Sequence, residues 1–251
     1  MVHLVERTTF KGSKTLLPAS LQSLIAQIQH HASLTPARLR DSVQAAQVQP
    51  HDLWPWADFE HPVTDGYGRQ LVYDGGSFEI MVMSWREGDF SAIHDHGATE
   101  WGVVQSFGQA AHYTYQLEGN LLTTRERCDF VPREIKLVDH DLIHQMGNGG
   151  SAPFLSLHVY GCDRAPAAGI TGNARIFDLW EHCIQYTDGG VFFALPEQDI
   201  RGRTPGIRGD RATTRRHHQQ LRDRLERMVA VQPEPGWCDR LTQLQQELAT
   251  L

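Results

Sequence analysis

The sequence predicts a mainly β protein: a sandwich or barrel of antiparallel strands, with helices before and after it in the chain. Short apolar or alternating runs follow one another from residue 67 to residue 160, with a turn about every 8–12 residues. Turns such as Asp74–Gly76 and Glu118–Gly119 are typical of hairpins. The expected strands are Arg69–Tyr73, Ser77–Trp85, Glu100–Phe107, Ala111–Gln116, Asn120–Arg125, Glu134–Val138 and Phe154–Tyr160.

Residues 20–48 predict two helices ahead of these strands. Apolar residues recur with the spacing of one helical face, at Leu21, Leu24, Ile25 and Ile28. We expect Ser20 to cap the first helix, and Thr35 followed by Pro36 is typical of the start of the second. Residues 49–66 contain three prolines among aromatic residues, which indicates an irregular connection to the barrel.

The chain beyond the strands is less regular. Residues 173–186 have apolar residues spaced for either a strand or a short helix. Residues 201–216 carry six arginines among glycines and prolines, which predicts a basic surface loop. Residues 211–230 and 238–251 predict two helices, which could pack on the barrel or form a subunit contact.

The bulk composition fits one globular domain of 251 residues. We expect a helical segment 1–66, a barrel core 67–165 and a C-terminal extension 166–251 within it. The net charge of −7 argues against a nucleic-acid partner. Neither a signal peptide nor a membrane-spanning segment is expected. The cysteines form no CxxC pair, which favours a reducing cytoplasm: Cys128, Cys162, Cys183 and Cys238.

Two histidines one residue apart, His94 and His96, are the first indication of a functional site. In a strand, residues i and i+2 share a face, so both imidazoles can reach one metal ion. Glu100 could also turn inward. A single HxH motif is often a chance match, and other residues must support it.

His144 provides that support, because it follows a strand-like run about fifty residues later. Three neutral imidazoles from neighbouring strands form a facial ligand set that leaves open positions on iron, manganese, nickel or zinc. The order Gly88, His94-x-His96, Glu100 and Gly108, with His144 and Asn148 later, resembles the two motifs of the cupin superfamily. This resemblance implies a double-stranded β-helix barrel.

The central segment further resembles the cysteine dioxygenase family of thiol dioxygenases. YGRQLVYDGG matches the segment with the substrate-carboxylate arginine, here Arg69, next to Tyr67. SAIHDHG and LIHQMGN match the metal-ligand segments, and SLHVYG matches a Ser-x-His-x-Tyr element. The resemblance implies Fe(II) held by three histidines, and a small thiol carboxylate that O2 oxidises to a sulfinic acid. It also implies a catalytic hydrogen-bonded relay of Ser156, His158 and Tyr160.

Two departures from the family keep alternatives open. Animal members carry a cysteine, crosslinked to the tyrosine, where this chain has Trp101 followed by Gly102. No thioether is therefore expected, and the substrate is L-cysteine or a similar mercapto acid such as 3-mercaptopropionate. Glu100 lies where many cupins place a fourth ligand; if it coordinates, a non-thiol metal enzyme is favoured. A cupin that binds a metal and a small acid without catalysis is the third alternative.

Overall fold

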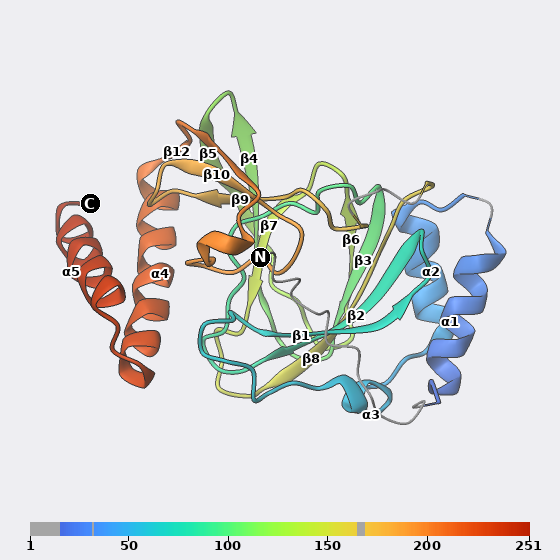
Figure 1. Cartoon of the computed structure of the whole chain (residues 1–251). Coiled ribbons are helices and arrows are strands. Elements are labelled where there is room, and N and C mark those ends of the chain that lie inside the picture. Colours follow the sequence, from blue (N-terminus) through green and yellow to red (C-terminus); the bar gives the residue numbers. More distant parts are fainter. Residues whose placement is uncertain (1–15, 32, 165–168) are drawn as a thin grey trace, which may run out of the picture.

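The structure, a computed structural model, describes residues 16–31, 33–164 and 169–251. Its centre is a barrel of two curved sheets (Figure 1). The five-stranded sheet contains, in order, β1 (Gly68–Asp74), β2 (Phe78–Trp85), β8 (Phe154–Gly161), β3 (Trp101–Ser106) and β6 (Ile135–Asp139). The four-stranded sheet contains β12 (Arg208–Gly209), β5 (Leu121–Arg127), β4 (Ala111–Glu118) and β7 (Ile143–Gly147). The predicted mainly β barrel is confirmed.

The central strand β2 shows how the barrel obtains two cores. Successive side chains of a strand point to opposite faces, and both faces of β2 are covered. Met81 and Met83 point into the barrel, whereas Ile80 and Val82 pack beneath the N-terminal helices. This two-sided burial explains why the strand reads as a nearly continuous apolar run.

The N-terminal helices cover the outer face of the five-stranded sheet (Figure 1). They are α1 (Ala19–His30), α2 (Pro36–Ala46), α3 (Pro50–Leu53) and the short η1 (Trp54–Trp56). The four predicted apolar residues of α1 are buried, and each contributes about 1.5–3 kcal/mol by leaving water. Thr35 caps α2 as predicted, by accepting from the Arg38 amide. The expected Ser20 cap is wrong, because its hydroxyl donates to Asp52 instead.

The C-terminal extension is more regular than the sequence indicated. Residues 173–186, whose spacing fits either a strand or a short helix, form most of a hairpin of β9 (Ala174–Asp178) and β10 (Cys183–Thr187). The predicted basic loop is wrong: beyond the short η2 (Glu197–Asp199) it contains β11 (Gly202–Pro205), β12 and the start of α4 (Arg211–Val231). β11 pairs with β10, and two of the arginines have acidic partners, since Arg201 pairs with Asp188 and Arg203 with Glu197.

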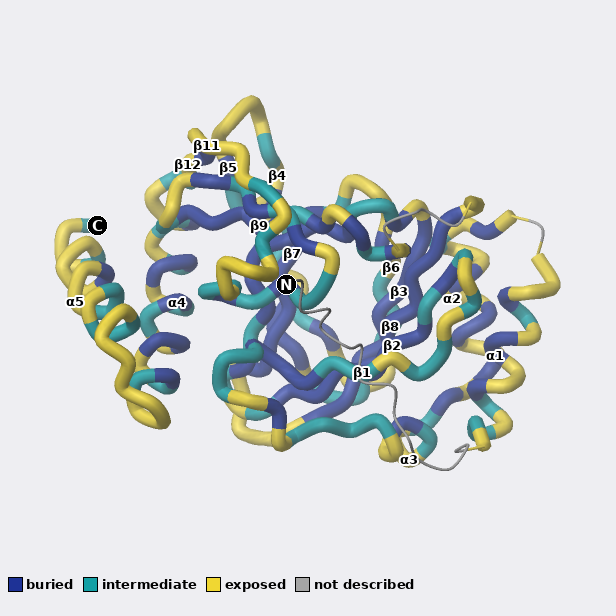
Figure 2. Tube along the Cα trace, viewed as in Figure 1, coloured by how far each residue is buried: buried dark blue, intermediate teal, exposed yellow. Residues whose placement is uncertain are grey.

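The two C-terminal helices lie on the opposite side of the barrel from α1 and α2 (Figure 1). α4 is buried along the side that faces the barrel, and α5 (Pro235–Thr250) packs on α4 while most of its surface is exposed (Figure 2). Leu244 is the one buried residue of α5. No helix in the described parts of the chain is long and apolar enough to cross a membrane.

His217, buried on α4, makes the stability of the fold sensitive to acid. Burial and the nearby Arg216 charge lower its pKa from 6.5 to about 3. As the pH falls, the unfolded chain therefore binds the proton first, and stability declines below about pH 6.5. Between pH 7 and 4.5 the expected loss is about 2–3 kcal/mol. Urea unfolding at several pH values in this range measures the free energy of unfolding, which should decrease less on acidification in His217→Phe than in wild type. An equal decrease in both proteins would contradict the assignment. The control is His30→Gln, which changes an exposed histidine and whose free energy of unfolding should decrease as that of wild type does.

Candidate metal centre and substrate pocket

Three buried histidines meet inside the barrel. One ring nitrogen from each of His94, His96 and His144 lies within 4.8 Å of the others. His144 lies within β7 rather than after a strand, and His94 and His96 lie in an extended segment between β2 and β3 rather than in a regular strand. A two-bond backbone bridge between His94 and His144, each N–O distance 2.9 Å, holds the two segments together. The extended backbone keeps the predicted alternation of side chains.

The hydrogen bonds of these rings leave nitrogens free at the centre of the cluster. His94 Nδ1 contacts the Ala92 carbonyl at 2.9 Å, and His144 Nδ1 contacts Nε2 of His112 at 2.9 Å. His144 Nε2 and both ring nitrogens of His96 are buried without a hydrogen-bond partner among the described residues. Unpartnered buried nitrogens are rare, and a metal ion would satisfy them. The residues therefore fit a metal held by three imidazoles.

Electrostatics keeps the three imidazoles neutral, the form that binds a metal. Burial lowers the pKa of His94 to about 4. Burial and the neighbouring rings hold the pKa values of His96 and His144 well below the usual 6.5. Each ring therefore retains a lone pair at neutral pH.

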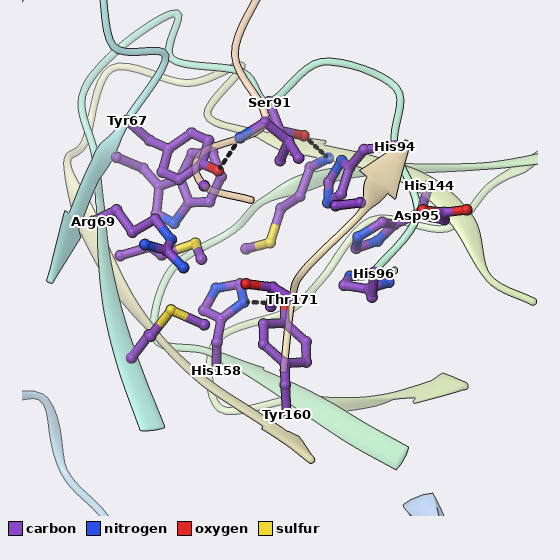
Figure 3. A pocket seen from close by; sticks show the side chains of 17 residues that line it. Tyr67, Arg69, Ser91, His94, Asp95, His96, His144, His158, Tyr160 and Thr171 are labelled. Carbon is purple, nitrogen blue, oxygen red and sulfur yellow. Dashed lines mark hydrogen bonds between the residues drawn. The ribbon is translucent and has the colours of Figure 1, made fainter. Parts of the chain in front are cut away.

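The two acidic residues next to these histidines point elsewhere. Glu100 is exposed, and its carboxylate accepts a hydrogen bond of 2.7 Å from the Asp163 amide. It lies outside the three-histidine cluster. Asp95 is turned away from the cluster (Figure 3), as expected from the alternation. It forms an ion pair with Arg175 of β9.

The histidines line one side of a cavity of about 40 Å³. A cavity that holds a single water molecule has a volume of about 10–15 Å³ when it is counted in the same way, so this cavity suits a ligand of a few non-hydrogen atoms. Arg69 reaches in from β1, across the cavity from the histidines (Figure 3). It makes no hydrogen bond or ion pair with any residue that the structure describes. Tyr67 is held beside it by stacking on Trp85, with ring centroids 4.7 Å apart.

The three predicted relay residues form a continuous hydrogen-bonded chain on the inner face of β8. Ser156 Oγ lies 2.7 Å from His158 Nε2, and His158 Nδ1 lies 2.8 Å from the Tyr160 hydroxyl. Trp85 Nε1 donates to Ser156 Oγ at 2.8 Å. Burial lowers the pKa of His158 to about 3 and raises that of Tyr160. Both residues are therefore neutral at physiological pH.

These contacts fit one direction of donation. The Trp85 indole can only donate, so Ser156 accepts from it and can donate its own hydroxyl hydrogen in a hydrogen bond to His158. His158 then donates from Nδ1 to Tyr160, whose hydroxyl hydrogen remains available to the cavity. The reverse direction would leave the fully buried Ser156 hydroxyl without an acceptor among the described residues.

The residue that faces Tyr160 is Gly102, not Trp101. Gly102 is the cross-strand partner of Tyr160, and a Cβ added there would lie 2.8 Å from the tyrosine ring. Trp101 instead packs among the residues beneath the N-terminal helices. The prediction that Trp101 occupies the position facing the tyrosine is therefore wrong by one residue, and the glycine there carries no sulfur for a thioether.

Part of the cavity wall comes from residues that the sequence did not indicate. Four residues of the extension line it, namely Thr171, Ala174, Gly189 and Val191. The extension can pack closely against the segment that carries His94 and His96 because residue 97 is a glycine. Gly97 has φ +56°, and a Cβ there would lie 2.2 Å from the Gly172 carbonyl oxygen. His112 was also missed, although it alternates onto the inner face of β4 and this pattern could have revealed it.

Comparisons with known proteins identify the family of this chain. The model of the family "Cysteine dioxygenase type I" matches residues 10–163. A cysteine dioxygenase type 1 from Danio rerio is 32% identical over 164 residues, which cover 59% of this chain and 77% of the relative.

Solved structures give more distant likenesses. A cupin-superfamily sugar phosphate isomerase from Silicibacter pomeroyi is 16% identical, with 58% of this chain and 82% of that chain covered and a TM-score of 0.38. A Klebsiella pneumoniae protein with a double-stranded β-helix domain is also 16% identical, with 45% and 90% covered and a TM-score of 0.36. The family assignment rests on the sequence matches: this chain belongs to the cysteine dioxygenase type I family.

Proposed function

We propose that this protein is an Fe(II)-dependent thiol dioxygenase that uses O2 to oxidise a small thiol carboxylate to its sulfinic acid. The observation that supports this most directly is the pairing of two features across one small cavity. A cluster of three histidines without a carboxylate lies on one side. Arg69, which has no hydrogen-bond or ion-pair partner among the described residues, reaches in from the other.

His94, His96 and His144 would hold the iron. When bound, Fe(II) supplies the redox chemistry and lowers the pKa of a thiol that it binds. Three neutral ligands leave the full charge of the ion uncompensated, which favours an anionic substrate group. They also leave coordination positions open. Glu100, bonded to the Asp163 amide, does not add a negative charge to this set.

Arg69 would bind the substrate carboxylate. Its planar guanidinium offers two parallel donors that match a carboxylate, and no described acidic residue competes for them. Such binding would direct the thiol of a short substrate toward the histidines. Tyr67, fixed against Trp85, borders the same part of the cavity.

Tyr160 would hold a proton at its hydroxyl, directed into the cavity. The relay through His158 and Ser156 fixes the orientation of that hydroxyl, and burial keeps it protonated by raising its pKa. Its ring lies beside His96, with centroids 5.0 Å apart, so the hydroxyl can donate to oxygen that reacts near the histidines.

The cavity selects for a carboxylate more clearly than for an amino group. Asp95 is the only acidic residue that borders it in the described chain, and its carboxylate is turned away and paired with Arg175. L-cysteine and a mercapto acid such as 3-mercaptopropionate are therefore both candidate substrates, and a thiol without a carboxylate is disfavoured.

Oxygen consumption by the Fe(II)-loaded protein tests the proposal. We expect stoichiometric O2 uptake and a sulfinate product with cysteine or 3-mercaptopropionate, with mercaptosuccinate as a bulkier comparison. Cysteamine, which lacks the carboxylate, should react at least about tenfold less efficiently, as expected for the loss of one charge-assisted contact. Bound iron without O2 uptake on any of these thiols would contradict the proposal and favour a binding protein.

A further inference from the structure

His112 stands behind one of the three clustered histidines. It lies on β4, whose ladder with β7 pairs His112 with Met146 and Thr114 with His144. Both histidines therefore face the barrel interior on diagonal positions of the same ladder. His112 Nε2 lies 2.9 Å from His144 Nδ1, and the two residues are 5% and 2% exposed.

A contact between two imidazole nitrogens can hold one hydrogen in either of two ways. If His112 donates, then neutral His144 carries its hydrogen on Nε2 and has no lone pair toward the cluster. If His144 donates from Nδ1, its Nε2 lone pair faces His94 and His96. Only the second arrangement allows His144 to bind a metal.

We propose that His112 is a positioning residue that accepts the Nδ1 hydrogen of His144 and thereby holds that ring in its metal-binding tautomer. This inference rests on the proposed metal centre. Metal-bound histidines generally donate their second ring hydrogen to a carboxylate, a carbonyl or water, which fixes the ring and raises its basicity. Here a neutral imidazole takes that role, so no negative charge is added beside the site.

The surroundings of His112 protect its contact with His144. His112 is 5% exposed, and its Nδ1 is buried without a hydrogen-bond partner among the described residues, so the contact with His144 is the one hydrogen bond of the ring there. Phe130 packs edge-on against the ring at 5.2 Å and helps to keep out water that could replace His112 as acceptor.

The backbone fixes where the His112 ring lies. The His112 amide donates to Asp129 Oδ1 at 3.1 Å, and the Cys128 amide donates to the His112 carbonyl at 2.9 Å. If His144 rotated away from the cluster, its hydrogen bond to His112 would therefore break, because the His112 ring would stay in place.

Anaerobic titration with Fe(II), in competition with a chelating dye, tests this role on the full chain. His112→Phe removes the acceptor and keeps an aromatic ring, and should raise the Kd for Fe(II) about 10–100-fold. His112→Gln offers an amide oxygen at a similar reach and should recover much of the affinity. The matched control is His217→Phe, which removes another buried histidine far along the chain on α4 and should leave the Kd unchanged.

A second measurement covers the case in which His112→Phe fails to fold. In the Zn(II)-loaded wild type, ¹⁵N NMR should show hydrogen on His144 Nδ1 and a lone pair on His112 Nε2. Hydrogen on His112 Nε2, or an unchanged Kd in His112→Phe, would overturn this inference while leaving the metal centre in place. A wild type that binds neither metal would overturn the metal centre itself, and this inference with it.

Discussion

His96→Ala is expected to abolish Fe(II) binding and reduce thiol oxidation to background. Both ring nitrogens of His96 are buried without a hydrogen-bond partner in the described chain, so the metal-free fold makes little use of them. In the wild type, Fe(II) at about 100–1,000 times its Kd should raise the free energy of unfolding by about 3–4 kcal/mol. The variant should show no such rise. Iron content and unfolding with and without Fe(II) measure both effects.

Glu100→Gln is the matched control for this prediction. The substitution removes a nearby carboxylate but keeps an oxygen that can accept from the Asp163 amide. We expect full iron content and an unchanged metal-linked stabilisation. Retention of iron in His96→Ala would contradict the three-histidine ligand set. Loss of iron in Glu100→Gln would show that Glu100 is a ligand.

The local parts of the site could be predicted because they depend on short-range alternation. His94 and His96 share a face in any extended backbone, and Ser156, His158 and Tyr160 do so along β8, where they form one hydrogen-bonded chain. The barrel itself follows from the hairpin turns and short strands. Such features need only the period of a strand, which the sequence displays directly.

Features set by pairing between distant segments could not be predicted in this way. Gly102 faces Tyr160 because of the register between β3 and β8, and counting residues from His96 placed that position at Trp101. Val191 reaches the cavity wall through a backbone bond to Ala92, 99 residues earlier in the chain. Glu100 turns outward because the Asp163 amide lies beside it. None of these contacts leaves a local pattern in the sequence.

The unpartnered state of Arg69 was likewise not visible in the sequence. An arginine on a strand commonly pairs with a surface carboxylate, but no acidic residue in the described chain forms an ion pair with Arg69. A guanidinium that lines a small cavity without a protein partner is a strong candidate for binding a ligand. This observation makes the role of Arg69 measurable independently of the metal ligands.

Arg69→Ala is expected to lower kcat/KM about 10–100-fold for a thiol carboxylate, mostly through KM, because about 1.5–3 kcal/mol of charge-assisted hydrogen bonding is lost. The loss should depend on the substrate's charge. Wild type should prefer 3-mercaptopropionate over its methyl ester, and the variant should lose most of that preference. Arg69→Lys, which keeps the charge without the planar fork, should fall between them. The ratio of kcat/KM for the acid to kcat/KM for the ester should therefore differ between wild type and Arg69→Ala. An equal ratio in these two proteins, with iron bound in both, would show that the carboxylate binds elsewhere.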